Sequence, residues 1–250
     1  MKLDVYFTPQ ELTPNEIAGR TVVAVDLLRA STTIVVALAA GAREILPADS
    51  TEEALRIAQN LESDQVVLAG ERKSVRIPGF ALGNSPLEFT PEAVGGRTIV
   101  LTTTNGTQAM IAAQGAREII VAAAVNFSVV VERARAALES TGELVVLCSG
   151  HDRHFALEDA FAAGRLAKVL LPPGGLRRVE VNDGAIAALE IARHYGERWV
   201  RALRASSHGR ELAALGYGRD VTLCATQDSH PILPLYADRR ITAHRAPLEG

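Results

Sequence analysis

Two segments of the chain share one pattern, and this repeat constrains the fold more than any other feature. Each begins with Arg-Thr, continues through a short apolar run and ends in Gly-Ala-Arg-Glu-Ile, at 41–45 and 115–119. The apolar, β-branched run at 22–25 is typical of a buried strand. The small-residue stretch that follows each loop is typical of a helix, and Gly41 stands where a helix often ends. We interpret the repeat as a duplicated βαβ unit; the alternative is that Ala-rich α/β chains converge on such strings.

The rest of the chain alternates in the same way. We expect further strands at 3–7, 45–48, 65–69, 119–124, 144–147, 179–181 and 221–224, with helices between most of them. Alternation of this kind predicts a three-layer α/β/α fold around a largely parallel sheet. A Pro-Pro-Gly-Gly break at 172–175 suggests a lobe at 1–172, which holds the duplicated units and a phosphate and metal site. Residues 173–250 would form a C-terminal α/β lobe that completes this site, or one continuous domain with the first.

The composition limits the kinds of molecule that the protein is expected to bind. The net charge of −3, without a basic stripe, argues against nucleic acid, and no apolar run is long enough for a membrane span. No signal peptide opens the chain. The two cysteines form no disulfide framework, so we expect a reducing cytoplasm. The predicted partner is a small phosphorylated molecule, and the Ala-rich helices are compatible with a homodimer.

Polar residues follow several predicted strands directly. They are Asp26, Arg29, Ser31 and Thr32; Glu71 and Arg72; Thr102, Thr103, Thr104, Asn105, Gly106 and Thr107; Ser149 and Gly150 with Glu158 and Asp159; and Asp228. Parallel sheets bind ligands outside the carboxyl ends of their strands, so we expect these residues to gather there. Ser31 is a good N-cap for the helix that follows it. A helix start with hydroxyls and an arginine suits phosphate.

The carboxylates in this set suit a hard divalent cation, which prefers oxygen ligands. Mg²⁺ with a phosphate monoester is the simplest chemistry that uses both halves of the set. Other phosphatase signatures are missing. Asp26-Leu27-Leu28 lacks the second aspartate of an Asp-x-Asp loop, and Cys148 has His154 six residues on, where a Cys-x5-Arg loop has arginine. Neither a P-loop nor a Gly-x-Ser-x-Gly elbow is present.

Five ordered blocks carry a family resemblance. They are Asp26-Leu-Leu-Arg-Ala-Ser-Thr-Thr33; Ala69-Gly-Glu-Arg72 with Gly79-Phe-Ala-Leu-Gly-Asn-Ser-Pro-Leu-Glu88; Thr102-Thr-Thr-Asn-Gly-Thr107; Cys148-Ser-Gly150 with Phe155-Ala-Leu-Glu-Asp159; and His208-Gly209 with Asp220-Val221, Cys224 and Asp228. The chain resembles the 2-phosphosulfolactate phosphatase (ComB) family. The resemblance implies Mg²⁺-dependent hydrolysis of 2-phospho-3-sulfolactate to 3-sulfolactate and phosphate, as in coenzyme M biosynthesis. The chain departs from the pattern at Ala156, where Ser is expected, at Ser74, where Gly is expected, and at Leu233-Pro234, where Val-Pro is expected.

These observations together assign roles. The predicted catalytic residues are Asp26, Arg29, Glu71, Asp159 and Asp228, and the predicted metal ligands are Asp26, Glu71 and Asp159. The predicted substrate-binding residues are Ser31, Thr32, Arg72, Asn84, Ser85, Thr103, Thr104, Asn105, Gly106, Thr107, Ser149, Gly150 and His208. Two of these residues also have a purely structural interpretation. Glu71 would be an ion-pair partner of Arg72, and Asp159 an ordinary acidic residue at a helix start.

Two mechanisms remain open, a metal-activated water and a phospho-aspartyl intermediate on Asp26. Two other functions also remain open: a phosphatase of another small phosphorylated hydroxy acid, and a binding protein for phosphorylated metabolites that hydrolyses nothing.

Overall fold

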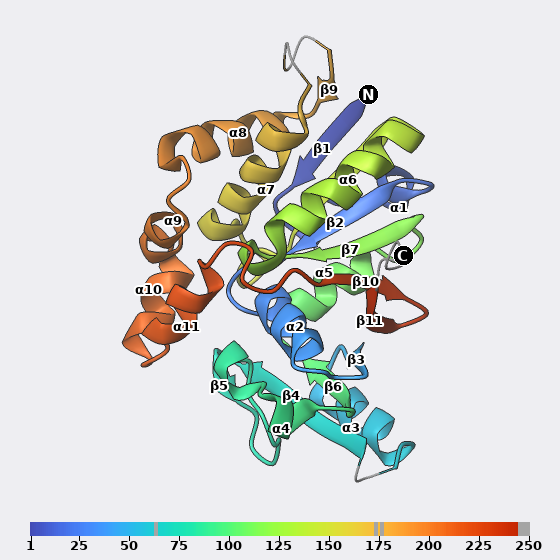
Figure 1. Cartoon of the computed structure of the whole chain (residues 1–250), viewed down its shortest axis with the longest axis vertical. Helices are drawn as coiled ribbons and strands as arrows, with labels where there is room; N and C mark the ends of the chain where they lie inside the picture. The colour runs from blue at the N-terminus through green and yellow to red at the C-terminus, as the bar shows by residue number, and fades with distance from the viewer. Residues whose placement is uncertain (63–64, 173–174, 176–177, 245–250) are drawn as a thin grey trace, which may run out of the picture.

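The computed structural model describes residues 1–62, 65–172, 175 and 178–244 (Figure 1). The described residues form one sheet in the order β5-β4-β6-β3-β11-β10-β7-β2-β8-β1-β9. The strands are β1 (Lys2–Tyr6), β2 (Thr21–Val25), β3 (Glu44–Pro47), β4 (Val66–Arg72), β5 (Val75–Arg76), β6 (Thr98–Thr102), β7 (Glu118–Ala122), β8 (Glu143–Cys148), β9 (Glu180–Val181), β10 (Leu233–Ala237) and β11 (Arg240–His244).

The α-helices are α1 (Pro14–Ile17), α2 (Ala30–Ala39), α3 (Thr51–Gln59), α4 (Pro91–Val94), α5 (Gly106–Ala112), α6 (Phe127–Thr141), α7 (Leu157–Leu170), α8 (Asp183–Tyr195), α9 (Trp199–Ala205), α10 (Ser207–Ala214) and α11 (Gly218–Cys224). None of the described helices is long and apolar enough to cross a membrane.

The duplicated unit is confirmed, and its two copies pair with each other reciprocally. The copies are β2-α2-β3 and β6-α5-β7. The second strand of each copy lies parallel to the first strand of the other, with β7 beside β2 and β3 beside β6. The Arg43 N–H donates to the Arg97 carbonyl, and the Arg117 N–H donates to the Arg20 carbonyl, both at 2.9 Å. The identical pentapeptides therefore make identical backbone contacts in the two copies.

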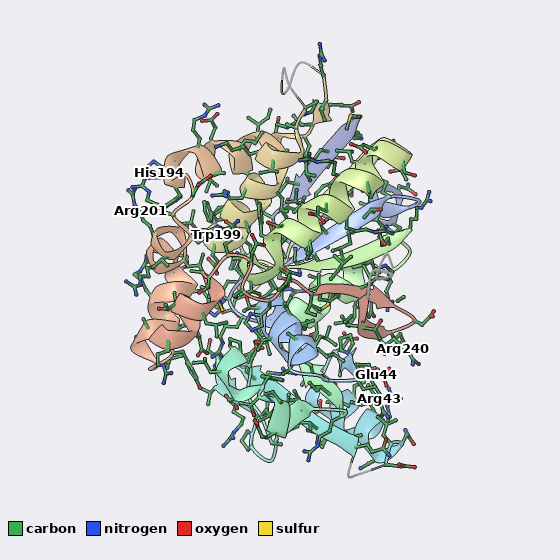
Figure 2. The ribbon with its side chains drawn as sticks, in the orientation of Figure 1. Arg43, Glu44, His194, Trp199, Arg201 and Arg240 are labelled. Carbon is green, nitrogen blue, oxygen red and sulfur yellow. The ribbon has the colours of Figure 1, made fainter. Side chains whose placement is uncertain are left out.

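The sheet has two parallel halves that an antiparallel hairpin joins. Between β7 and β3 lies the hairpin β10–β11, and the pairings β7–β10, β10–β11 and β11–β3 are all antiparallel. The first half contains β7, β2, β8 and β1, and the second contains β3, β6 and β4. Arg240 of β11 donates to Glu44 of β3 at 3.2 Å, which ties the hairpin to the second half (Figure 2). The sheet is mostly parallel, as predicted, because the strands within each half are parallel.

The prediction of a strand at 221–224 was wrong, because these residues lie in the helix α11. Val221 and Cys224 are buried while Thr222 is exposed and Leu223 is half-buried. A spacing of three places residues on one face of a helix, whereas a strand would bury every second residue.

Helices cover both faces of the sheet. Val23 and Val25 of β2 belong to a buried cluster with residues of α6 and α7, whereas Val22 and Ala24 belong to one with residues of α2 and α5. Successive strand residues point to opposite faces, so β2 is buried on both sides. This confirms the three-layer α/β/α prediction. In Figure 1, α6, α7 and α8 lie together over the half that contains β1 and β2.

The predicted break at 172–175 falls partly on residues 173–174, outside the described residues. Strands from beyond it join the same sheet: β9 pairs with β1, and β10 and β11 lie at the centre. The C-terminal segment thus supplies the hairpin that joins the two halves.

Candidate active site

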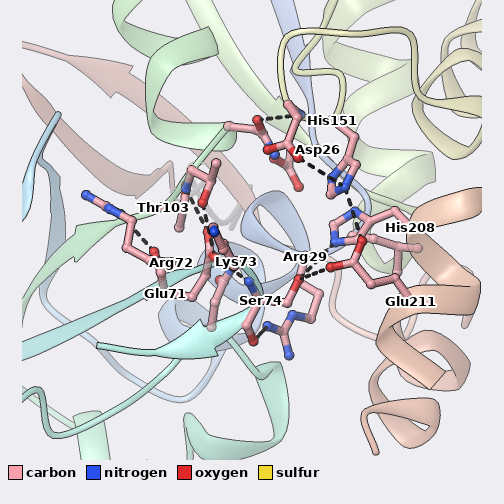
Figure 3. Close-up of a pocket in the computed structure, with 15 residues that line it drawn as sticks. Asp26, Arg29, Glu71, Arg72, Lys73, Ser74, Thr103, His151, His208 and Glu211 are labelled. Carbon is pink, nitrogen blue, oxygen red and sulfur yellow. Dashed lines mark hydrogen bonds and ion pairs between the residues drawn. The ribbon is translucent and has the colours of Figure 1, made fainter. Parts of the chain in front are cut away.

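A pocket of about 430 Å³ lies where the carboxyl ends of strands from both halves meet. It is lined by Asp26, Leu28 and Arg29 after β2; Glu71, Arg72, Lys73 and Ser74 at the end of β4; Thr103, Thr104 and Asn105 after β6; His151 and Asp152 after β8; His208 and Glu211 of α10; and Asn84. In Figure 3, the labelled residues of β4 lie on one side of the view and His151, His208 and Glu211 on the other.

Asp26 is the carboxylate at the junction of β2 and α2. Its Oδ1 accepts the Ala30 N–H at 3.0 Å, while Oδ2 makes no hydrogen bond with any described residue. The Ser31 hydroxyl accepts the Asp26 N–H at 3.0 Å and lies within the helix. The predicted N-cap at Ser31 is therefore corrected, because Asp26 itself accepts the free amide at the helix start.

Burial gives Asp26 an unusual acidity. The pKa of its carboxyl is raised to about 6, mainly because the side chain is buried, while the charge of His208 and the Ala30 N–H oppose the rise and the charges of Glu158 and Glu71 add to it. A carboxylate with a pKa this close to neutrality can exchange a proton during a reaction.

Gly106 makes room for this carboxylate. A Cβ at this position would lie 2.4 Å from the Ala30 Cβ and 2.8 Å from Asp26 Oδ2. The start of α5 therefore approaches the start of α2 as closely as a glycine allows, and the two copies of the repeat meet at Asp26.

Glu71 organises the opposite wall. Its Oε1 accepts the Thr104 N–H at 2.7 Å, and its Oε2 accepts the Ser74 N–H at 2.8 Å. The carboxylate thus joins the β6–α5 loop to the turn after β4. Arg72 donates to the Glu71 carbonyl and to the Thr102 hydroxyl, so it forms no ion pair with the Glu71 carboxylate.

Arg29 lies in a buried network. It donates to Asp220 at 2.8 Å and to the Ser74 carbonyl at 2.9 Å, and its guanidinium lies 4.3 Å from the centre of the Tyr217 ring. Its Nε has no partner among the described residues. Ser85 donates to the second oxygen of Asp220 at 2.9 Å, so Ser85 supports Arg29 from outside the pocket lining.

His208 pairs with a carboxylate behind it. Its Nδ1 lies 3.5 Å from Glu158 Oε1, and its ring stacks on that of His151 with centroids 4.1 Å apart. Burial opposes the charged imidazole, but the hydrogen bond and charge of Glu158, with the charges of Asp26 and Glu211, outweigh burial and raise the pKa of His208. The imidazole is therefore a proton donor near neutral pH.

Asp159 lies behind the pocket and connects two loops. Its two oxygens accept the Leu27 N–H at 2.9 Å and the Gly150 N–H at 3.2 Å. Burial and the charges of Asp26 and Glu158 raise its pKa well above the ordinary value. Asp159, Ser149 and Gly150 do not line the pocket. Their hydrogen bonds indicate that they support the loop that carries Asp26 rather than bind a ligand.

The prediction that Asp228 gathers with these carboxylates is corrected. Asp228 accepts the backbone N–H and the hydroxyl of Ser128 at 2.6 and 2.7 Å, at the start of α6, and does not line the pocket. The misassigned strand at 221–224 had placed Asp228 at a strand end.

The predicted residues of the two loops that begin α2 and α5 divide into two groups. Thr103, Thr104 and Asn105 line the pocket, whereas Ser31, Thr32, Gly106 and Thr107 lie behind them. The hydroxyl of Thr103 accepts the Thr107 N–H at 3.2 Å, and that of Thr32 donates to the Leu27 carbonyl at 3.0 Å. Asn84 lines the pocket, and its buried Oδ1 has no partner among the described residues.

No three His, Cys, Asp or Glu side chains among the described residues are close enough to hold a metal ion. Asp26, Glu71 and Asp159 are thus not brought together as one ligand cluster. Mg²⁺ commonly binds one or two carboxylates and takes its other oxygens from water and substrate phosphate. Asp26 Oδ2 and Asn84 Oδ1 are oxygens of the type it prefers. The lining also holds four carboxylates (Asp26, Glu71, Asp152 and Glu211) against three Lys and Arg residues (Arg29, Arg72 and Lys73). His208 adds a positive charge when it is protonated, so the cations of the lining do not outnumber its carboxylates. A divalent cation fits the unbonded oxygens of Asp26 and Asn84.

Several lining residues were not predicted: Leu28, Lys73, Ser74, His151, Asp152 and Glu211. His151 and Asp152 directly follow the Cys-Ser-Gly end of β8, and Lys73 and Ser74 directly follow Arg72 at the end of β4. Glu211 lies on α10, three residues after the predicted His208, which was the sequence signal for this helix.

The mostly parallel α/β sheet and this pocket of acids, arginines and paired imidazoles define an α/β protein with an enzyme-like site. A family model described as 2-phosphosulpholactate phosphatase matches residues 6–239. Proteins named probable 2-phosphosulfolactate phosphatase are similar throughout. That of Symbiobacterium thermophilum is 42% identical over 90% of this chain and 95% of its own. Those of Caldanaerobacter subterraneus (36%, covering 94% and 95%) and Deinococcus radiodurans (41%, covering 90% of each) are comparable. The chain belongs to the 2-phosphosulfolactate phosphatase family.

Proposed function

We propose that the protein hydrolyses 2-phospho-3-sulfolactate to 3-sulfolactate and phosphate with Mg²⁺, in the manner of coenzyme M biosynthesis. The observation that carries the proposal is Asp26, a buried carboxylate with one oxygen fixed by a helix amide and the other unbonded at a pocket. The family membership supplies the substrate class.

The charge of the pocket supports the metal. The substrate carries a phosphate, a sulfonate and a carboxylate, whereas the positive side chains of the lining, with His208 protonated, only balance its four carboxylates. Asp26, with Asn84, would hold the Mg²⁺, which when bound would neutralise charge on the phosphoryl oxygens.

The residues of the chain supply the remaining chemistry. Water provides the oxygen of the new P–O bond, and the bond between phosphorus and the C2 oxygen breaks. Asp26 takes the proton of the attacking water, or attacks phosphorus itself before water releases the phosphate; both routes stay open. His208 donates a proton to the departing C2 oxygen, and Arg29 is held beside the site by Asp220 to bind an anionic oxygen.

Phosphate release tests the proposal. We expect release from 2-phospho-3-sulfolactate with Mg²⁺, little release with EDTA, and a preference over 2-phospholactate. Equal or better turnover of phospholactate would retain the phosphatase and discard the sulfonate substrate. Binding of phosphate without hydrolysis of either ester would favour the binding protein. Cytoplasmic location and homodimer assembly stay predictions from the sequence.

A further inference from the structure

Lys73 differs from the other cations of the pocket. Arg29 is held by Asp220 and by the Ser74 carbonyl, and Arg72 by the Glu71 carbonyl and the Thr102 hydroxyl. Lys73 lines the same pocket, is exposed, and makes no hydrogen bond or ion pair with any described residue. Its charge is therefore available to a ligand.

The turn that carries Lys73 is fixed and strained. Glu71 accepts the Ser74 N–H and the Thr104 N–H, which anchors the turn against the β6–α5 loop. Lys73 and Ser74 have φ of 53° and 64°, a region that glycine occupies most easily. The two residues form the tight turn between β4 and β5, so the position of Lys73 at the pocket is set by the backbone.

Asp26 and Lys73 lie at different depths in the pocket. Asp26 is 5% exposed and lies at the buried end, whereas Lys73 is exposed at the mouth. A substrate whose phosphate reaches Asp26 can hold a second anionic group nearer the mouth, where the Lys73 ammonium has no hydrogen bond or ion pair with a described residue. An ammonium with three rotatable donors suits the three oxygens of a tetrahedral sulfonate, whereas a carboxylate better matches the planar fork of arginine.

We propose that Lys73 binds the sulfonate of the substrate and thereby sets the preference for a substrate with a second strong anion. The proposal rests on the proposed function. It makes Lys73 a specificity-determining residue, since the sulfonate takes no part in the bond that breaks.

Substitution tests the contact. Relative to wild type, Lys73→Met should lower the ratio of kcat/KM for phosphosulfolactate to that for phospholactate by about 10- to 100-fold. Lys73→Arg should retain most of the ratio. Lys168→Met, which removes an exposed lysine on α7, is the matched control and should change nothing. An unchanged ratio in Lys73→Met would overturn the proposal, and so would an equal loss with both esters, which would place Lys73 on the carboxylate.

Chemical footprinting gives a second readout that needs no turnover. Lysine occurs only at Lys2, Lys73 and Lys168, so acetylation of each is resolved by mass spectrometry. The product 3-sulfolactate, at about ten times its Kd, should slow acetylation of Lys73 about tenfold and leave Lys168 unaffected, whereas lactate at the same concentration should not protect. Lack of protection by bound 3-sulfolactate would contradict the proposal. If wild type releases phosphate from neither ester, the proposed function fails and this footprint alone decides the Lys73 contact.

Discussion

The Arg29 guanidinium donates to the Asp220 carboxylate at 2.8 Å, and both side chains are at most 3% exposed. Removal of one partner from a buried pair leaves the other charge unpaired, at a cost of about 3–5 kcal/mol. Asp220→Ala should therefore lower the free energy of unfolding by about this amount in urea denaturation. It should also raise KM, because Arg29 loses the contact that orients it.

The exposed pair Arg193–Glu190 on α8 is the control for this substitution. Glu190→Gln should change the free energy of unfolding by less than about 0.5 kcal/mol. Equal effects of the two substitutions on the free energy of unfolding would show that the buried pair stabilises the fold no more than an exposed one.

Asp26 should destabilise the metal-free fold when it is ionised. Its pKa of about 6 in the folded protein lies above the ordinary value of 3.8 for an aspartate, so the folded state holds the proton more tightly than the unfolded chain. Stability associated with the proton is present below pH 4 and is lost as the pH rises through 6. In EDTA at pH 8, Asp26→Asn should therefore raise the free energy of unfolding by about 1–3 kcal/mol, and the gain should vanish near pH 4.

Asp228 should have the opposite effect on stability, because its pKa is lowered rather than raised. Burial opposes its ionisation, but hydrogen bonds from Ser128 and Gln227 lower its pKa. Asp228→Ala should cost about 1 kcal/mol at pH 8 through the lost contact at the start of α6, and this cost should decrease as the pH falls through the lowered pKa. A stabilising Asp228→Ala, or a destabilising Asp26→Asn, in urea titrations at pH 8 would contradict these assignments.

Gly106 should tolerate no side chain. The Cβ of Gly106→Ala would meet both the Ala30 Cβ and Asp26 Oδ2, so we expect a loss of about 1–3 kcal/mol in stability and a fall in kcat. Gly218→Ala is the matched control, since its Cβ would meet nothing within 4 Å. Full activity in Gly106→Ala would mean that the close approach of α5 and α2 does not matter for the site.

Glu158 should set the acidity of His208. Glu158→Gln removes the anion 3.5 Å from Nδ1 and should lower the pKa of His208, because the protonated imidazole loses its partner. NMR titration should show this shift, and the alkaline limb of kcat/KM should move to lower pH. His194, exposed on α8, is the internal control, and its resonances should superimpose in the two proteins. A shifted limb without a shift at His208 would remove His208 as the proton donor.

Local patterns in the sequence predicted most of the fold. The apolar run of β2, the small residues of α2 and the repeated pentapeptide each depend on neighbours along the chain, and all predicted correctly. The hairpin β10–β11 was missed because Pro234 interrupts its first strand, and because its turn places Asp238 and Arg239 at positive φ without the usual glycine. Since this hairpin lies between the two parallel halves, the order of the strands in the sheet was not predicted from the sequence.

The candidate site was predictable to the same extent. Asp26, Arg29, Glu71 and the Thr103–Asn105 loop directly follow strands, and all line the pocket. Glu211 and the stacking of His151 on His208 depend on how α10 packs against the loop after β8, which no local pattern encodes. From the sequence alone, Asp159 cannot be distinguished from a metal-binding aspartate. The structure shows that its carboxylate instead accepts two backbone N–H groups.

Phosphate release from 2-phospho-3-sulfolactate with Mg²⁺, compared between wild type, Asp26→Asn and Asp228→Asn, tests the central claim most directly. Loss of a nucleophile or base should lower kcat by at least about 10²–10⁴-fold in Asp26→Asn, in protein that remains folded. Asp228→Asn removes one carboxylate outside the pocket and should retain turnover. Substantial release by Asp26→Asn, or none by wild type, would contradict the account.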